Sequence, residues 1–222
     1  RVIVHGFRGH DDIHIESATL PATIFGGVGH DSLYGGGADD RIAGGPGHDV
    51  LVGGAGNDQI GGQAGHDSLT GGPGNDFLRG GAGRDVFVET LTDDGSLVAT
   101  GHILNGSLGR DILIRIESLY ITGDAGDNLI DVSMTSLPAV LLGRGGNDTL
   151  VGSSESDLIR GGTGADLIFG HGGNDRLDGG FQNDRIYGGA GNDVIRGNDG
   201  DDQLNGGDGQ DSLDGGAGND TL

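Results

Sequence analysis

Aspartate returns at every ninth residue over two long stretches of the chain, residues 26–88 and 143–222. Each Asp is the sixth residue of a unit Gly-Gly-x-Gly-x-Asp-x-U-x, in which U is Leu, Ile or Phe. The first residue is Gly in all sixteen units, whereas the second and fourth vary. Carboxylates are hard oxygen ligands, and glycines let backbone carbonyl groups approach a ligand closely. The spacing therefore predicts binding of a hard cation.

Each unit divides into a glycine-rich turn and a short strand that together position the carboxylate. The last three residues, x-U-x, alternate polar, apolar and polar, which is typical of a minimal strand with one inward side chain. Two units then complete a coil of 18 residues, and residue i lies about 4.8 Å from residue i+18. We expect an all-β coil with two short-stranded sheets, an inner ladder of U side chains and turns along both edges.

This stacking sorts the aspartates into columns. The columns of the first stretch are Asp31, Asp49, Asp67 and Asp85 on one edge and Asp40, Asp58 and Asp76 on the other. Carboxylates about 5 Å apart repel by roughly 0.8 kcal/mol in water, and more strongly in a drier site. Calcium fits between them because it takes six to eight oxygen ligands, whereas magnesium prefers a smaller octahedral site. Ions that bridge successive coils would number about twelve, enough to offset the net charge of −22.

The composition excludes several classes of function. The 34 acidic residues outnumber 12 basic residues, all of them Arg, which argues against nucleic acid or an anionic membrane as partner. Cysteine is absent, so there is no disulfide or thiolate metal site. With 52 Gly and 33% hydrophobic residues, an ordinary globular core is not expected. No apolar run reaches the ~20 residues of a membrane span. The chain opens without a signal-peptide pattern and ends inside a unit, so we expect it to be a piece of a longer protein.

The units resemble the glycine-rich calcium-binding nonapeptides of the RTX (repeats-in-toxin) family. The resemblance implies a parallel β-roll, a right-handed β-solenoid, in which calcium lies between successive turns. It also implies export by a type I system and folding outside the cell. The implied side-chain ligands are Asp31, Asp40, Asp49, Asp58, Asp67, Asp76, Asp85, Asp148, Asp157, Asp166, Asp175, Asp184, Asp193, Asp202, Asp211 and Asp220. The implied carbonyl ligands belong to Gly27, Gly29, Gly44, Gly45, Gly47, Gly53, Gly54, Gly56, Gly71, Gly72, Gly74, Gly161, Gly162, Gly164, Gly188, Gly189, Gly191, Gly206, Gly207 and Gly209.

Weaker units outside the two stretches reveal a longer period. Units 6–14 and 106–114 keep the carboxylate as Asp11 and Asp111, which we add to the candidate ligands, whereas unit 123–131 has Asn128 instead. Units 6–14 and 123–131 are each followed by a similar sequence, Leu-Pro-Ala-Thr-Ile-Phe at 20–25 and Leu-Pro-Ala-Val-Leu-Leu at 137–142. The two sequences lie 117 residues apart. We therefore expect a duplicated module, residues 1–117 and then 118–222, with nonapeptides at 26–88 and 143–222. Residues 89–117 are expected to form calcium-poor rungs, and the alternative for the stretch 89–122 is a linker between two rolls.

Four histidines share the fifth position of units on one edge: His10, His30, His48 and His66. We expect their rings to stack at a solvent-facing turn position, and the alternative is a transition-metal ladder or a pH sensor. The acidic pairs at 39–40 and 201–202 each place only their second Asp at position six, which favours calcium over acid–base catalysis. Glu155 replaces a position-four glycine, so it either weakens that site or adds an oxygen.

No sequence motif of a common enzyme class is present. The chain has no His-Glu-x-x-His, no Gly-x-Ser-x-Gly and no Gly-Lys-Ser/Thr after its glycines. We therefore expect a non-enzymatic module that folds on meeting extracellular calcium, most simply in a bacterial surface or structural protein. One alternative is the carboxyl-terminal export domain of a secreted protease, lipase or toxin. Another is a carbohydrate-binding accessory module of a polysaccharide-modifying enzyme, and self-association or polysaccharide contact is a further expectation.

Overall fold

A computed structural model describes residues 1–16, 19–91, 96–100, 103–106 and 109–222. Within these ranges the chain forms 24 strands and no helix, so no helix there could span a membrane. The predicted all-β class is confirmed. The strands belong to two compact units: unit 1 comprises Arg1–Glu89 with His102–Leu119, and unit 2 comprises Thr90–Gly101 with Tyr120–Leu222.

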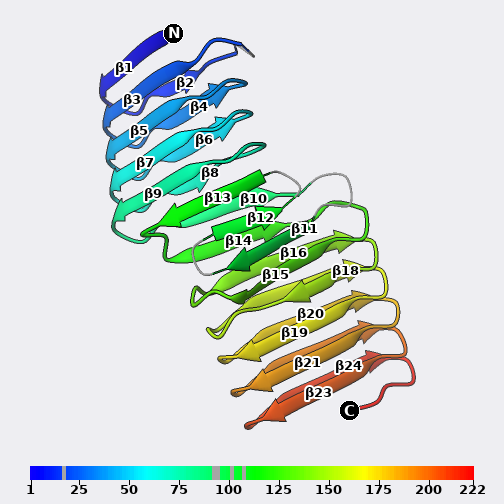
Figure 1. Cartoon of the computed structure of the whole chain (residues 1–222). Helices are drawn as coiled ribbons and strands as arrows, with labels where there is room; N and C mark the ends of the chain where they lie inside the picture. The colour runs from blue at the N-terminus through cyan, green and yellow to red at the C-terminus, as the bar shows by residue number, and fades with distance from the viewer. Residues whose placement is uncertain (17–18, 92–95, 101–102, 107–108) are drawn as a thin grey trace. The chain divides into compact units, whose positions relative to one another are not determined.

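Unit 1 contains two sheets whose strands follow one another along the stack (Figure 1). Its first sheet has the order β1 (Val2–Arg8), β3 (Ala22–Val28), β5 (Arg41–Pro46), β7 (Gln59–Ala64), β9 (Phe77–Ala82), β13 (Gly109–Ile114) and β12 (Ile103–Gly106). Its second sheet has the order β2 (Asp12–His14), β4 (Ser32–Gly36), β6 (Val50–Gly54), β8 (Ser68–Thr70) and β10 (Val86–Thr90).

Unit 2 repeats this plan. Its first sheet has the order β11 (Ser96–Thr100), β15 (Leu129–Met134), β17 (Thr149–Val151), β19 (Leu167–Gly172), β21 (Arg185–Ala190) and β23 (Gln203–Asp208). Its second sheet has the order β14 (Ser118–Thr122), β16 (Ala139–Gly145), β18 (Leu158–Thr163), β20 (Arg176–Phe181), β22 (Val194–Asp199) and β24 (Ser212–Ala217). β14 straddles the boundary between the units.

The strands of the nonapeptide stretches pair in parallel with an offset of 18 residues. Leu33 pairs with Leu51 in unit 1, and Ile159 pairs with Leu177 in unit 2. The first rung of unit 1 is 20 residues long, because Ile13 pairs with Leu33. The two extra residues arise because 11 residues, and not nine, separate unit 6–14 from unit 26–34. The parallel β-solenoid with 18-residue coils is therefore confirmed.

The core of each unit is the ladder of U side chains. Leu51, Leu69 and Phe87 are fully buried in unit 1, as are Ile168 and Ile186 in unit 2. The residues on either side of U point outward, as the polar-apolar-polar pattern requires. Each coil thus contributes two apolar side chains to a narrow core and presents four outward ones.

The stretch that lacks strict nonapeptides departs locally from the parallel pattern. β13 pairs in parallel with β9, where Ile112 lies beside Phe77, but β12 pairs with β13 in an antiparallel hairpin. In unit 2, β11 pairs in parallel with β15. The side chain of Asp111, one of the candidate ligands, lies outside the described side chains.

Candidate metal centre

The position-six aspartates form continuous hydrogen-bonded columns along the turns. The Oδ1 atom of each Asp accepts a hydrogen bond from the backbone N–H of the residue one coil earlier. For example, Asp58 accepts from Asp40 at 2.7 Å, and Asp193 accepts from Asp175 at 2.9 Å. The columns of unit 1 are Asp11, Asp31, Asp49, Asp67 and Asp85, and Asp40, Asp58 and Asp76. Those of unit 2 are Asp148, Asp166, Asp184, Asp202 and Asp220, and Asp157, Asp175, Asp193 and Asp211.

The second oxygen of these carboxylates, Oδ2, is buried in most of the columns. Among the described residues, no protein donor hydrogen-bonds to the buried Oδ2 atoms of Asp11, Asp31, Asp40, Asp49, Asp58, Asp67, Asp85, Asp148, Asp166, Asp175, Asp184, Asp193 and Asp202. A buried polar atom without a partner is rare in native proteins, and a buried charge needs a counter-charge. The repeated arrangement therefore fits a cation beside each Oδ2.

Burial raises the pKa of several of the buried column carboxyl groups above the ordinary Asp value of 3.8. Burial raises the pKa of Asp58 to about 7, with repulsion from Asp76 and Asp40 adding to it and the hydrogen bond from Asp40 opposing it. The same cause raises the pKa of Asp175 and of Asp184 to about 7. Without a cation, the charged form of Asp58, Asp175 and Asp184 is therefore disfavoured below about pH 7.

The first glycine of each unit faces its own carboxylate. A Cβ on Gly53 would collide with Oδ2 of Asp58 and would lie 2.7 Å from the carbonyl oxygen of Gly71, the first glycine of the next coil. In unit 2, a Cβ on Gly161 would likewise collide with Asp166 Oδ2. Carboxylate and carbonyl oxygens thus converge on a space that a side chain would fill. This donor set suits calcium, and it explains why position one is invariably Gly.

Glycines at positions two and four serve a different purpose. Gly45 has a φ of 119°, and a Cβ there would collide with the carbonyl oxygen of Gly27 one coil earlier. Gly47 has the same relation to the Gly29 carbonyl. A positive φ at these positions lets the backbone pass close to the carbonyl groups of the previous coil. Five residues that replace glycine at these positions keep a positive φ: Gln63 (85°), Arg144 (77°), His171 (73°), Gln182 (75°) and Asn198 (75°). Ala38, Ser153 and Glu155 do not, so these positions tolerate replacement in two ways.

Most candidate ligands predicted from the sequence lie in these turns, but two units differ. At Asp157, Oδ2 accepts a hydrogen bond of 2.6 Å from the Ser153 N–H of its own turn, so this carboxylate is not left without a donor. The change comes from the serine at position two of that unit. Burial raises the pKa of Asp157, and repulsion from Glu155 adds to the rise. At unit 123–131, Asn128 Oδ1 accepts from the Asp124 N–H within the turn.

Sequence reasoning missed one acidic residue of a column. Glu117 Oε2 accepts a 2.7 Å hydrogen bond from the Asp85 N–H and so extends the column of unit 1 by one rung. The sequence contained a signal, because Glu117-Ser-Leu-Tyr repeats the motif Asp31-Ser-Leu-Tyr with Glu in place of Asp. No group of three or more His, Asp or Glu side chains that could hold a metal occurs in the part of the chain that the structure describes.

The predicted histidine stack is confirmed. Neighbouring rings of His30, His48 and His66 lie 4.8 Å apart, and His10 extends the stack at 4.9 Å. Each Nδ1 accepts the N–H of the position-five residue one coil later. His30 Nδ1 accepts from the His48 N–H at 2.7 Å, and His66 Nδ1 accepts from the Arg84 N–H at 2.9 Å. Asn57 Oδ1 accepts the Asn75 N–H in the same way on the other edge. The rings therefore act as turn-to-turn hydrogen-bond acceptors, which favours the structural interpretation over a metal ladder.

The chain matches the family described as "RTX calcium-binding nonapeptide repeat (4 copies)". The matches cover residues 23–51, 52–87, 142–177, 151–186 and 187–222, which together span about two thirds of the sequence. A search of the curated proteins finds no relative of this chain.

The raised pKa values predict an opposite pH dependence for the calcium-free and calcium-bound forms. A carboxyl whose pKa rises from 3.8 to about 7 on folding, as at Asp58 and Asp148, favours the folded chain at low pH. This stabilisation is lost as the pH rises towards 7. In chelator we therefore expect more β signal by circular dichroism at pH 5 than at pH 8. In excess calcium we expect the fold to be retained at pH 8, and the calcium midpoint to rise as the pH falls.

The imidazole rings of the histidine column need a control of their own. Replacing His10, His30, His48 and His66 by Asn keeps an acceptor of the kind that Asn57 provides and removes the imidazoles of the stack. This variant should retain the pH dependence that the carboxyls cause. A calcium-free chain that gains structure from pH 5 to pH 8 would contradict the prediction.

Proposed function

Because the chain belongs to the RTX calcium-binding nonapeptide repeat family, we propose that it is a calcium-dependent folding and structural module of a secreted protein. Calcium lies between successive turns and is held by position-six carboxylates with backbone carbonyls of positions one, two and four. The observation that carries this proposal is the row of buried Oδ2 atoms that lack a protein donor.

The bound ions act by linking coils that would otherwise repel one another. Asp58 is hydrogen-bonded to the coil on either side, since it accepts from Asp40 and its N–H donates to Asp76. A divalent cation beside its Oδ2 replaces like-charge repulsion with attraction to oxygens of two coils. Binding free energy therefore becomes folding free energy. At the sub-micromolar calcium of a cytosol the chain stays unfolded, and at the millimolar calcium outside cells it folds.

Counting the bound ions tests this proposal directly. Equilibrium dialysis of the whole chain against calcium should give about twelve ions per chain, bound in the ~10⁻⁴–10⁻³ M range of extracellular modules. Magnesium at the same concentration should leave most sites empty because it keeps its waters. Fewer than about four bound calcium ions, or equal binding of magnesium, would refute a ladder of bridging sites.

Loss of a carboxylate from the middle of a column should disturb two neighbouring sites. In Asp58→Ala we expect the calcium midpoint of folding to rise at least about three-fold, since charge-assisted contacts are worth ~1.5–3 kcal/mol each. In Asp220→Ala, at the last rung of its column, we expect little change. The midpoint is read by circular dichroism during a calcium titration. Equal shifts in the two variants would mean that the sites do not bridge coils.

The 117-residue offset between units 6–14 and 123–131 bears on the parent protein. Repeated long modules suit an extended surface structure such as a stalk, surface layer or fibre, whereas an export domain needs only one short block. We therefore place this module in a bacterial surface or extracellular structural protein without an activity of its own. Sequencing the complete gene tests this proposal, because a catalytic motif in the same protein would favour the export domain of an enzyme.

A further inference from the structure

A groove on the outer face of unit 2 gathers positive charge in an otherwise acidic chain. It has a volume of about 350 Å³ and crosses β18, β20 and β22 in the second sheet. Its lining residues are Leu158, Arg160, Arg176, Leu177, Asp178, Val194 and Arg196. We propose that this groove binds an anionic glycan through the carboxylate or sulfate groups of its sugars.

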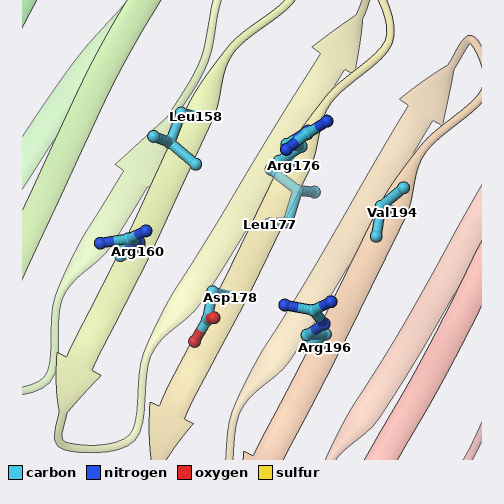
Figure 2. Close-up of a pocket in the computed structure, with 7 residues that line it drawn as sticks. All are labelled: Leu158, Arg160, Arg176, Leu177, Asp178, Val194 and Arg196. Carbon is cyan, nitrogen blue, oxygen red and sulfur yellow. The ribbon is translucent and has the colours of Figure 1, made fainter.

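The register of the strands arranges the lining side chains in two rows (Figure 2). One row runs from Leu158 through Arg176 to Val194, and the register of the three strands sets these residues side by side. The second row runs from Arg160 through Asp178 to Arg196 in the same way. Arg160 and Arg196 are therefore two strands apart, about 10 Å at the usual strand spacing.

The three guanidinium groups are available to a ligand. Cross-strand pairing with Asp178 is the obvious structural role for Arg160 and Arg196. In the described chain, however, neither forms an ion pair with it, and Asp178 Oδ1 accepts a hydrogen bond of 2.8 Å from Asn198 Nδ2 instead. Arg160, Arg176 and Arg196 are all exposed. Three planar donor groups on one face suit bidentate recognition of carboxylate or sulfate.

The surroundings of the arginines favour a glycan over other polyanions. Leu158 and Val194 add apolar surface to the same row as Arg176, which suits the apolar faces of sugar rings. Double-stranded DNA carries a charge about every 1.7 Å, which is much denser than the spacing of about 10 Å between Arg160 and Arg196. A glycan spaces its charges at least one sugar apart. An extended chain lying across the strands can therefore meet Arg160 and Arg196 with separate acidic sugars.

The test is isothermal titration calorimetry on the whole chain, folded in about 5 mM calcium, above the ~10⁻⁴–10⁻³ M range of such sites. The probes are a galacturonic acid trimer for carboxylates and a heparin tetrasaccharide for sulfates. Maltotriose is the neutral probe, and a short single-stranded DNA tests the other polyanion class. We expect binding of at least one acidic glycan, and much weaker binding of maltotriose and DNA.

Substitutions assign the binding to the groove. The triple variant Arg160→Gln, Arg176→Gln, Arg196→Gln should bind the acidic glycan at least about ten-fold more weakly, since exposed charge pairs contribute a few-fold each. Asp178→Asn removes the one acid of the groove and should tighten binding. Arg185→Gln, on β21 of the first sheet, is the matched control and should change affinity less than two-fold.

Circular dichroism in calcium first establishes that each variant is folded, so that loss of binding is distinct from loss of the solenoid. The proposal is overturned if neither acidic glycan binds, if the triple variant binds as well as the parent chain, or if maltotriose binds equally. Tighter binding of the DNA would also overturn it, because the groove would then recognise a different polyanion.

Discussion

We expect removal of calcium by a chelator to unfold the chain to a disordered, expanded state, and calcium to restore the β structure. This is the largest effect we expect. A pH of 8 lies above the raised pKa values of Asp58 and Asp184, which are about 7. At this pH such buried carboxyls of the columns would have to be charged without a counter-ion. The U ladder cannot offset this cost, because each coil buries only two large apolar side chains. Far-ultraviolet circular dichroism in chelator and then in calcium measures the change.

The transition should be steep in calcium concentration. Each coil supplies oxygens to two successive calcium sites of a column. Binding at one site therefore orders the coil that forms the next site. Magnesium at equal concentration is the control and should restore little structure. A chain that keeps its β signal in chelator at pH 8 would show that hydrogen bonds and core packing suffice. The proposed coupling of folding to calcium would then be wrong.

The parts of the fold that obey the nine-residue period were predictable, because a fixed period determines the register. Counting 18 residues from Leu33 correctly gives Leu51 as its neighbour. The Asp columns and the histidine stack follow from the same count. What could not be predicted lies where the count stops: Ile112 pairs with Phe77, 35 residues away, and nothing in the intervening sequence determines that offset.

The nine-residue period also does not predict the hydrogen bonds within a turn. The pattern shows that Ser153 replaces a glycine, but not that its N–H turns to the Asp157 carboxylate. The hydrogen bond depends on φ at position two, which is positive for the glycines and for Gln63 or Arg144. Glu117 was missed for a different reason. Its local motif, Glu-Ser-Leu-Tyr, is regular, but its distance from the previous unit is not a multiple of nine residues. Spacing thus predicts which residues stack, and local backbone conformation decides which atoms meet.

Methyl groups added at two glycines of the same unit should have opposite effects. Gly53 is the first residue of unit 53–61, and a Cβ there would collide with Asp58 Oδ2 and crowd the Gly71 carbonyl oxygen. We expect Gly53→Ala to displace the oxygens that hold calcium and to destabilise the folded chain by about 1–3 kcal/mol, the usual cost of overpacking. The calcium midpoint should rise and the thermal unfolding midpoint in excess calcium should fall.

Gly61, the ninth residue of the same unit, is the matched control. A Cβ there would meet no atom within 4 Å, and its φ is not positive. Gly61→Ala should leave the calcium midpoint unchanged and raise the thermal midpoint slightly, because alanine restricts the unfolded chain by ~0.4–1 kcal/mol. Both variants lose the same flexibility in the unfolded state, so the difference between them reports the folded state alone. Similar behaviour of the two variants would mean that the invariant glycine is required for chain flexibility. The close approach of carboxylate and carbonyl around Gly53 would then have no part in binding calcium.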